Sequence, residues 1–336
     1  MSAAGSAARL IAGLAGAAAL VTLPWWVPDF YLLHLATLIG VYWVLVAGLN
    51  LVVGYTGPLS VGHVGLLAIG AYAFAILAGT HGLDPQLTLL IAAALGGLTG
   101  FLLGLPSLRL PGFYFALVTL AFALIVTELV LARGDLTGGG IGLPVPGFDG
   151  PLASPEGYYW FVLAIGVVVT WLAWNIVRLM WGRALIAVRD SEVTAASVGV
   201  SIYRAKLYAF TFSGVTAGAA GALFASLQSY ITPDTFIFEL GLFFFVCIII
   251  GGRGGILGPF LGTVVLTALP ELVAPLAKLG TLFYGLLLLL VVLLLPEGIG
   301  RLFDILVERL RGRRAESHVV RPDLERLAAA LREGPP

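Results

Sequence analysis

Long apolar runs separated by short polar breaks dominate the amino-acid sequence. A helix needs about 20 apolar residues to cross the hydrocarbon core of a bilayer. The runs are rich in Leu, Ala and Gly and lack the period-2 alternation of barrel strands, so we expect helices, which pair their own backbone groups. We predict ten spans, at 8–28, 32–53, 59–79, 87–105, 113–133, 158–178, 207–228, 238–252, 256–273 and 279–295.

One charged segment, residues 178–206, lies between two of these runs. It carries Arg178, Arg183, Arg189, Asp190, Glu192, Arg204 and Lys206. Charged side chains are costly in hydrocarbon, so the charged segment is predicted to be a loop at one membrane face. Its interior is rich in Ala and free of Pro, which favours one short helix outside the bilayer that stops at Gly199. A rigid surface helix of this kind is suited to passing motion from a partner to the membrane core.

The basic residues indicate which way the chain is inserted. If the N-terminus is cytoplasmic, all of the 18 Lys and Arg residues except Arg133 and Lys278 lie inside, as the positive-inside rule requires. Residues 134–157 contain acidic side chains and no Lys or Arg, which is typical of an outer loop. We therefore expect both termini and the charged segment on the cytoplasmic side.

Gly and Pro interrupt two apolar runs near a predicted membrane face. The first interrupted segment, GYTGPLSVGHVG at 54–65, weakly resembles the second, GGRGGILGPFLG at 251–262. Paired interruptions of this kind are typical of transporters with internal repeats, and they often mark the substrate path. The candidate path residues are Asn50, Tyr55, Thr56, Gly57, Ser60 and His63. For His63 we favour the alternative of packing or a structural hydrogen bond.

Composition agrees with a polytopic membrane protein. Hydrophobic residues make up 60% of the chain and charged residues 11%, against about one quarter charged in soluble domains. A net charge of zero gives no reason to expect nucleic-acid binding. The lone Cys247 excludes an intrachain disulfide, and neither a catalytic nor a metal-ligating cluster of His, Asp, Glu or Cys is recognisable.

The two lysines exclude one mode of ATP binding. Lys206 and Lys278 both follow Ala, so the phosphate-binding sequence GxxxxGK[ST] cannot occur. The chain is not expected to be an enzyme, and any ATP hydrolysis belongs to another polypeptide. An ion-coupled secondary transporter remains an alternative, although Glu128 and Glu271 lie near span ends rather than at mid-membrane.

Five stretches resemble a known family, the permease subunits of ABC importers for branched-chain amino acids, and in particular its longer LivM type. They are GLNLVVGYTGPLSVGHVGLLAIGAY (48–72), LRLPGFYFALVTLAF (108–122), LTGGGIGL (136–143), GRALIAVRDSEVTAASVGVSIYRAKLYAF (182–210) and IIGGRGGILGPFLG (249–262). The resemblance implies an all-α importer permease of about ten membrane helices, some interrupted, in a bacterial or archaeal plasma (inner) membrane. It divides the chain into an N-terminal membrane helix (1–30), a permease core (31–295) with a coupling loop (179–206), and a cytoplasmic tail (296–336).

The same resemblance implies partners. A sibling permease completes the path as a heterodimer, two ABC ATPases hold ATP and Mg²⁺, and an external binding protein delivers the substrate, while this chain carries no cofactor. The coupling helix would lie within Ala187–Gly199, and its ATPase contacts would be Arg189, Asp190, Glu192, Ala195, Ala196 and Gly199. The general importer signature, Glu-Ala-Ala with Gly four residues later, is altered here, which leaves the individual contacts open. Urea or a short amide is an alternative cargo.

Overall fold

A computed structural model describes residues 18–26, 29–107, 112–273 and 285. The chain divides into two units, Met1–Arg301 and Leu302–Pro336, and every described residue belongs to the first. Residues 18–26 of the first predicted span are helical. The rest of that span, nearly all of the span predicted at 279–295, and the tail at 296–336 lie outside the described residues.

The described part of the chain is almost entirely helical, which confirms the all-α prediction. Seven helical segments in it are long and apolar enough to cross a membrane. They are α2 (Phe30–Val53), α3 (His63–Phe74) with the π-helix η1 (Ala75–Thr80), α4 (Pro85–Ser107), α5 (Gly112–Ala132), α7 (Pro155–Arg178), α10 (Ile202–Gln228), and η3 (Pro233–Thr235) with α11 (Phe238–Gly251). A shorter apolar helix, α12 (Gly258–Val273), corresponds to the span predicted at 256–273.

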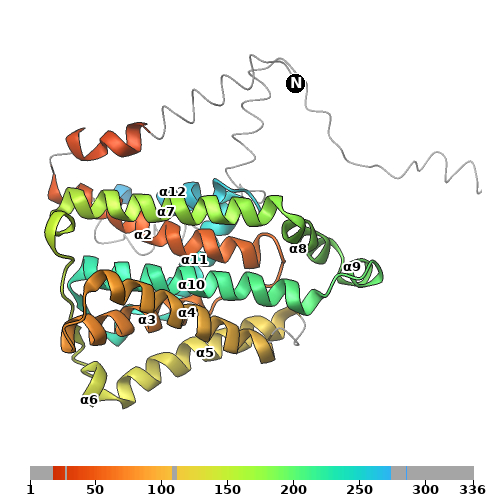
Figure 1. The fold of residues 1–336 in the computed structure, drawn as a ribbon, viewed down its shortest axis with the longest axis horizontal. Helices are drawn as coiled ribbons and strands as arrows, with labels where there is room; N and C mark the ends of the chain where they lie inside the picture. Colours follow the sequence, from red (N-terminus) through yellow and green to blue (C-terminus); the bar gives the residue numbers. More distant parts are fainter. Residues whose placement is uncertain (1–17, 27–28, 108–111, 274–284, 286–336) are drawn as a thin grey trace, which may run out of the picture. The chain divides into compact units, whose positions relative to one another are not determined.

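Short elements connect these helices at two opposite ends. Figure 1 shows α8 (Met180–Asp190) and α9 (Glu192–Ser197) beyond the ends of α7 and α10, with α6 (Gly134–Thr137) at the far end of α5. Near α6, β1 (Leu143–Pro144) pairs antiparallel with β2 (Tyr230–Ile231), Leu143 opposite Ile231, and η2 (Gly150–Ala153) leads into α7. The charged segment and the acidic loop therefore lie at opposite ends of the bundle.

Glycines let the central helices approach closely. A Cβ atom on Gly218 of α10 would clash with the carbonyl oxygen of Ala92 in α4, and one on Gly70 of α3 would clash with Gly218 itself. Small residues at such contacts allow backbones to pack in direct contact, which drives helix association in membranes. Among the described spans α2 and α10 are the most enclosed, with 72% of an 18-residue window of each buried, against 17% for α7.

The charged segment differs from the single helix predicted for it. Two helices form, because α8 ends at Asp190 and α9 begins at Glu192. Ser191 between them is extended, and its side-chain oxygen accepts a hydrogen bond from the Thr194 amide at 3.2 Å. Ser competes with the helix backbone for hydrogen bonds and favours the N-cap position, so it divides the Ala-rich stretch. The predicted stop at Gly199 is confirmed by its positive φ of 81°.

Candidate functional site

The first interrupted segment begins with a widened turn at the end of α2. The amides of Gly54 and Tyr55 both donate to the carbonyl oxygen of Asn50, at 2.8 and 3.1 Å. Gly57 has a positive φ of 94°, which favours glycine, and Pro58 follows without an amide donor. The chain thus leaves the helix here, and backbone carbonyls at the end of α2 need partners from elsewhere.

Asn50 joins this end of α2 to the second interrupted segment. Its side-chain amide donates to the carbonyl oxygen of Gly255 at 2.9 Å, and its side-chain oxygen accepts from the Gly254 amide at 3.2 Å. Asn50 is 3% exposed, and both hydrogen bonds are partly buried. Backbone freed from helices at membrane depth requires such partners. The structure therefore places the two interrupted segments in direct contact.

Arg189, at the end of α8, reaches the same place. Its guanidinium Nη1 donates to the carbonyl oxygen of Gly54 at 2.9 Å. A cation near the C-terminus of a helix stabilises it by about 0.3–1 kcal/mol, and here the helix is α2. Burial raises the pKa of the Tyr55 phenol above its ordinary value, and the nearby charge of Arg189 partly opposes that increase. The Arg189 side chain therefore links the end of α8 to the end of α2, and 38% of it stays exposed.

A second polar contact holds α9. The ammonium of Lys206, near the start of α10, lies 2.6 Å from the carboxylate of Glu192. The Lys206 side chain is only 10% exposed, whereas that of Glu192 is 55% exposed. An ammonium buried to this degree needs a partner, so the ion pair fixes the first turn of α9 to α10.

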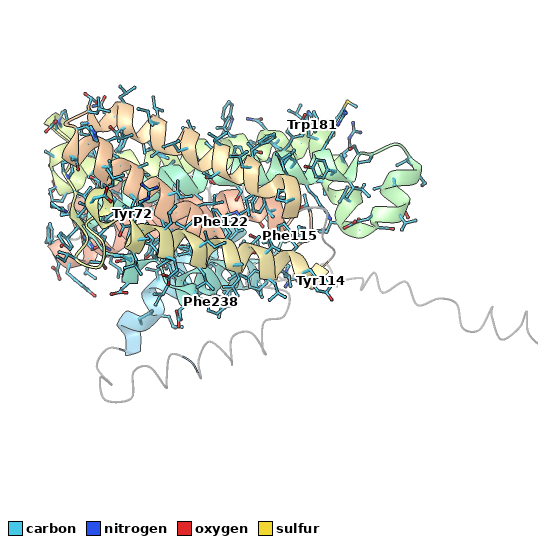
Figure 2. The ribbon with its side chains drawn as sticks, turned by 90° about the horizontal axis from the view of Figure 1, so that it is seen from below. Tyr72, Tyr114, Phe115, Phe122, Trp181 and Phe238 are labelled. Atoms are coloured by element: carbon cyan, nitrogen blue, oxygen red, sulfur yellow. The ribbon has the colours of Figure 1, made fainter. Side chains whose placement is uncertain are left out.

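A groove opens between these contacts and the first interrupted segment. It has a volume of about 340 Å³ and is lined by Thr56, Gly57, Pro58, Phe115, Val188, Arg189, Asp190, Ser191, Glu192 and Lys206. Figure 2 shows Phe115 and Tyr114 of α5 and Trp181 of α8 toward the end from which α8 and α9 extend, and Tyr72 toward the opposite end. Of the six predicted path residues, Thr56 and Gly57 line this groove.

The other predicted path residues face the protein interior. The ring of His63 contacts two hydroxyls, with Nδ1 2.9 Å from Ser60 Oγ and Nε2 2.7 Å from Ser213 Oγ. His63 is 1% exposed, and its ring packs against Phe210. These contacts favour a structural hydrogen bond between α3 and α10. Asn50 and Tyr55 border a small void of about 10 Å³.

The predicted ATPase contacts fall on different faces of α8 and α9. Ala195 is buried, Ala196 is exposed, and Arg189 is partly exposed while it donates to the Gly54 carbonyl. Two apolar side chains that were not predicted, Val193 and Val198, are 83% and 72% exposed. The α9 region therefore exposes two large apolar side chains, beside polar ones such as Glu192. Within the described ranges, no group of three or more His, Cys, Asp or Glu side chains could hold a metal ion.

A family profile described as "branched-chain amino acid transport system / permease component" matches residues 31–295. This chain belongs to that family. The permease is 35% identical to the high-affinity branched-chain amino acid transport system permease protein LivM of Escherichia coli K12 over 292 residues, which cover 79% of this chain and 69% of the relative. It is 25% identical over 263 residues to the probable LivM of Methanocaldococcus jannaschii, covering 66% and 75% of the two chains.

Another relative of the permease has a different cargo in its name. The autoinducer 2 import system permease protein LsrC of Enterobacter sp. 638 is 30% identical over 217 residues, covering 59% of each chain. No solved structure matches the permease. Membership of this family, together with the seven apolar helices of the described region, makes the chain a multi-pass membrane permease subunit of an ABC transporter.

Proposed function

We propose that this permease is one subunit of an ATP-driven importer that carries branched-chain amino acids through the plasma or inner membrane by alternating access. The observation that carries the proposal is the 35% identity to LivM of Escherichia coli over 79% of the chain. ATP and Mg²⁺ are held by two partner ABC ATPases, a sibling permease completes the path, and an external binding protein supplies the amino acid. Both termini lie in the cytoplasm.

The outward face of α9 supports docking of an ATPase. Val193 and Val198 expose apolar surface at the charged end of the molecule, and exposed apolar patches rimmed by charge mark protein contacts. Asp190 and Glu192, which line the groove beside α8 and α9, lie close to Val193 in the chain. Docking here would act on helices that are attached to both α2 and α10 by the contacts of Arg189 and Lys206.

Reconstitution tests this function. The complete complex in proteoliposomes, with its binding protein, is expected to accumulate radiolabelled leucine when ATP is supplied to the ATPase side, and an ionophore should have no effect. Unlabelled isoleucine and valine should compete, whereas urea and autoinducer 2 should not. Uptake by the permease alone that an ionophore abolishes would contradict the proposal and favour a secondary transporter. Competition by urea alone would assign a different cargo.

A further inference from the structure

One side chain connects the charged end of the molecule to both interrupted segments. Arg189 donates to the carbonyl oxygen of Gly54, which follows the last residue of α2. One turn earlier in α2, Asn50 holds Gly254 and Gly255 of the second interrupted segment. An added Cβ on Gly254 would itself lie 3.0 Å from Arg189 Nη1. The guanidinium is therefore in contact range of both segments at once.

We propose, on the basis of the importer function above, that Arg189 is a positioning residue that transmits movement of α8 to both interrupted segments together. It does so through its bond to the Gly54 carbonyl, although its side chain is 38% exposed and also lies 3.5 Å from the Asp190 carboxylate. Arg suits this position because its planar group keeps its charge and presents several donors in a fixed geometry. A carbonyl oxygen at a helix C-terminus carries partial negative charge, so the contact resists being pulled apart.

A separate contact accounts for the attachment of α9. The ion pair between Lys206 and Glu192 holds α9 to α10 and does not involve Arg189. The apolar side chains of Leu185 and Val188 keep α8 packed against the core, since they are 3% and 1% exposed. Loss of the Arg189 contact should therefore leave α8 and α9 in place while the interrupted segments no longer follow them.

The test uses the complete complex in proteoliposomes and compares Arg189→Gln, Arg189→Lys and Arg183→Gln. Arg183 is the matched control, because it is an exposed cation on the same helix. Two quantities are measured: leucine imported per ATP hydrolysed, and the change in amide hydrogen exchange that nucleotide causes in residues 54–57, 192–198 and 252–257. The exchange readout separates transmission of movement from a general loss of stability.

For Arg189→Gln we expect import per ATP to fall about tenfold, the effect of losing one charge-assisted hydrogen bond. ATP hydrolysis should continue, and nucleotide should still alter exchange in 192–198 but no longer in 252–257. Arg189→Lys should recover part of the import, and Arg183→Gln should match the unmodified complex. Wild-type import per ATP, or a wild-type exchange response at 252–257, in Arg189→Gln would overturn the inference.

The outcomes remain informative if one variant does not assemble. Arg189→Lys then decides, because it keeps the charge but loses the second nitrogen and the reach of the guanidinium. Import per ATP equal to that of the unmodified complex would overturn the inference, and a reduced ratio would support it. Failure of the unmodified complex to import leucine with ATP would instead contradict the proposed function, so the two failures are distinguishable.

Discussion

Individual polar residues in this permease serve to join helices. His63 is a clear case, because both ring nitrogens are engaged by hydroxyls and the side chain is buried. Asn50 is another, since its two polar atoms are taken up by backbone groups more than 200 residues away in sequence. Residues that look like substrate ligands in the sequence are thus used to satisfy interrupted backbone and to fix one helix against another.

Ser213→Ala tests the structural role of His63. The substitution leaves a buried ring nitrogen without its hydroxyl partner, which costs about 1–3 kcal/mol. We expect a lower thermal unfolding midpoint in detergent but an unchanged KM for leucine uptake by the assembled complex. Ser197→Ala is the control, because Ser197 is exposed and bonds only within its own helix. If Ser213→Ala instead raised the KM for leucine and left thermal stability unchanged, His63 would be assigned to the substrate path.

Asn50 and Arg189 could be singled out from the sequence, but the groups that they bond to could not. Asn50 was selected because it is polar beside an interrupted apolar run, and Arg189 because the family resemblance placed it among the ATPase contacts. Their common target near Gly54 and Gly254 depends on a contact between segments that are distant in the chain. Lys206 and Ser213 were missed as functional partners for the same reason, since nothing in their local sequence indicates which helix they face.

At the level of elements, close glycine contacts determine how the central helices pack. In α10, Gly214 and Gly218 face α4, while Gly221 faces α3, and a Cβ atom on any of them would meet backbone atoms of those helices. Backbone cannot move aside as a flexible side chain can, so these contacts set the distance between α3, α4 and α10. These three helices therefore form the tightly packed part of the bundle.

Gly218→Ala tests this packing. One added methyl group must push α4 and α10 apart, and overpacking of this kind costs about 1–3 kcal/mol. We expect a lower unfolding midpoint and a smaller yield of folded permease in detergent. Gly147→Ala is the matched control, because a Cβ atom there would meet no atom within 4 Å. Equal stability of the two variants would contradict close packing between α4 and α10.

The eight spans predicted between residues 32 and 273 match described helices to within a few residues, because hydropathy is a local property of the sequence. The charged segment shows the limit of prediction from local sequence. Its Ala content predicts helix throughout, but Ser191 adopts an extended conformation and caps the next helix. Whether a residue such as Ser191 continues or ends a helix depends on small free-energy differences that the tertiary contacts decide. The short helix α9 and its outward apolar face were therefore not predictable from composition.

Across the whole molecule, the two ends of the bundle differ in chemistry. One end carries α8, α9 and the groove with its charged lining, and the other carries the acidic loop with β1 and β2. This separation is consistent with different partners at the two membrane faces. The basic residues of the sequence had predicted the same division, since Arg133 is the one basic residue of the described region that lies at the α6 end.

Val193→Asp combined with Val198→Asp tests the α9 surface. Charges on this exposed apolar face should weaken association with the ATPases, and each removed hydrophobic contact is worth about 1–2 kcal/mol. We expect the ATPases to be lost during affinity purification of the permease, while the permease itself remains folded. Ile141→Asp is the control, because Ile141 is 80% exposed near α6 at the opposite end. Undiminished co-purification of the ATPases would contradict docking on α9.

The bond between Asn50 and the Gly254–Gly255 backbone also constrains how permeases of this family can be recombined. Consider a chimera that takes residues 251–262 from a relative but keeps residues 48–65 of this chain. The Asn50 side chain would then face a backbone turn other than the one formed by Gly254 and Gly255. Exchanging both stretches as a set preserves that match. When transport properties are transferred between such permeases, the two segments should therefore be exchanged together.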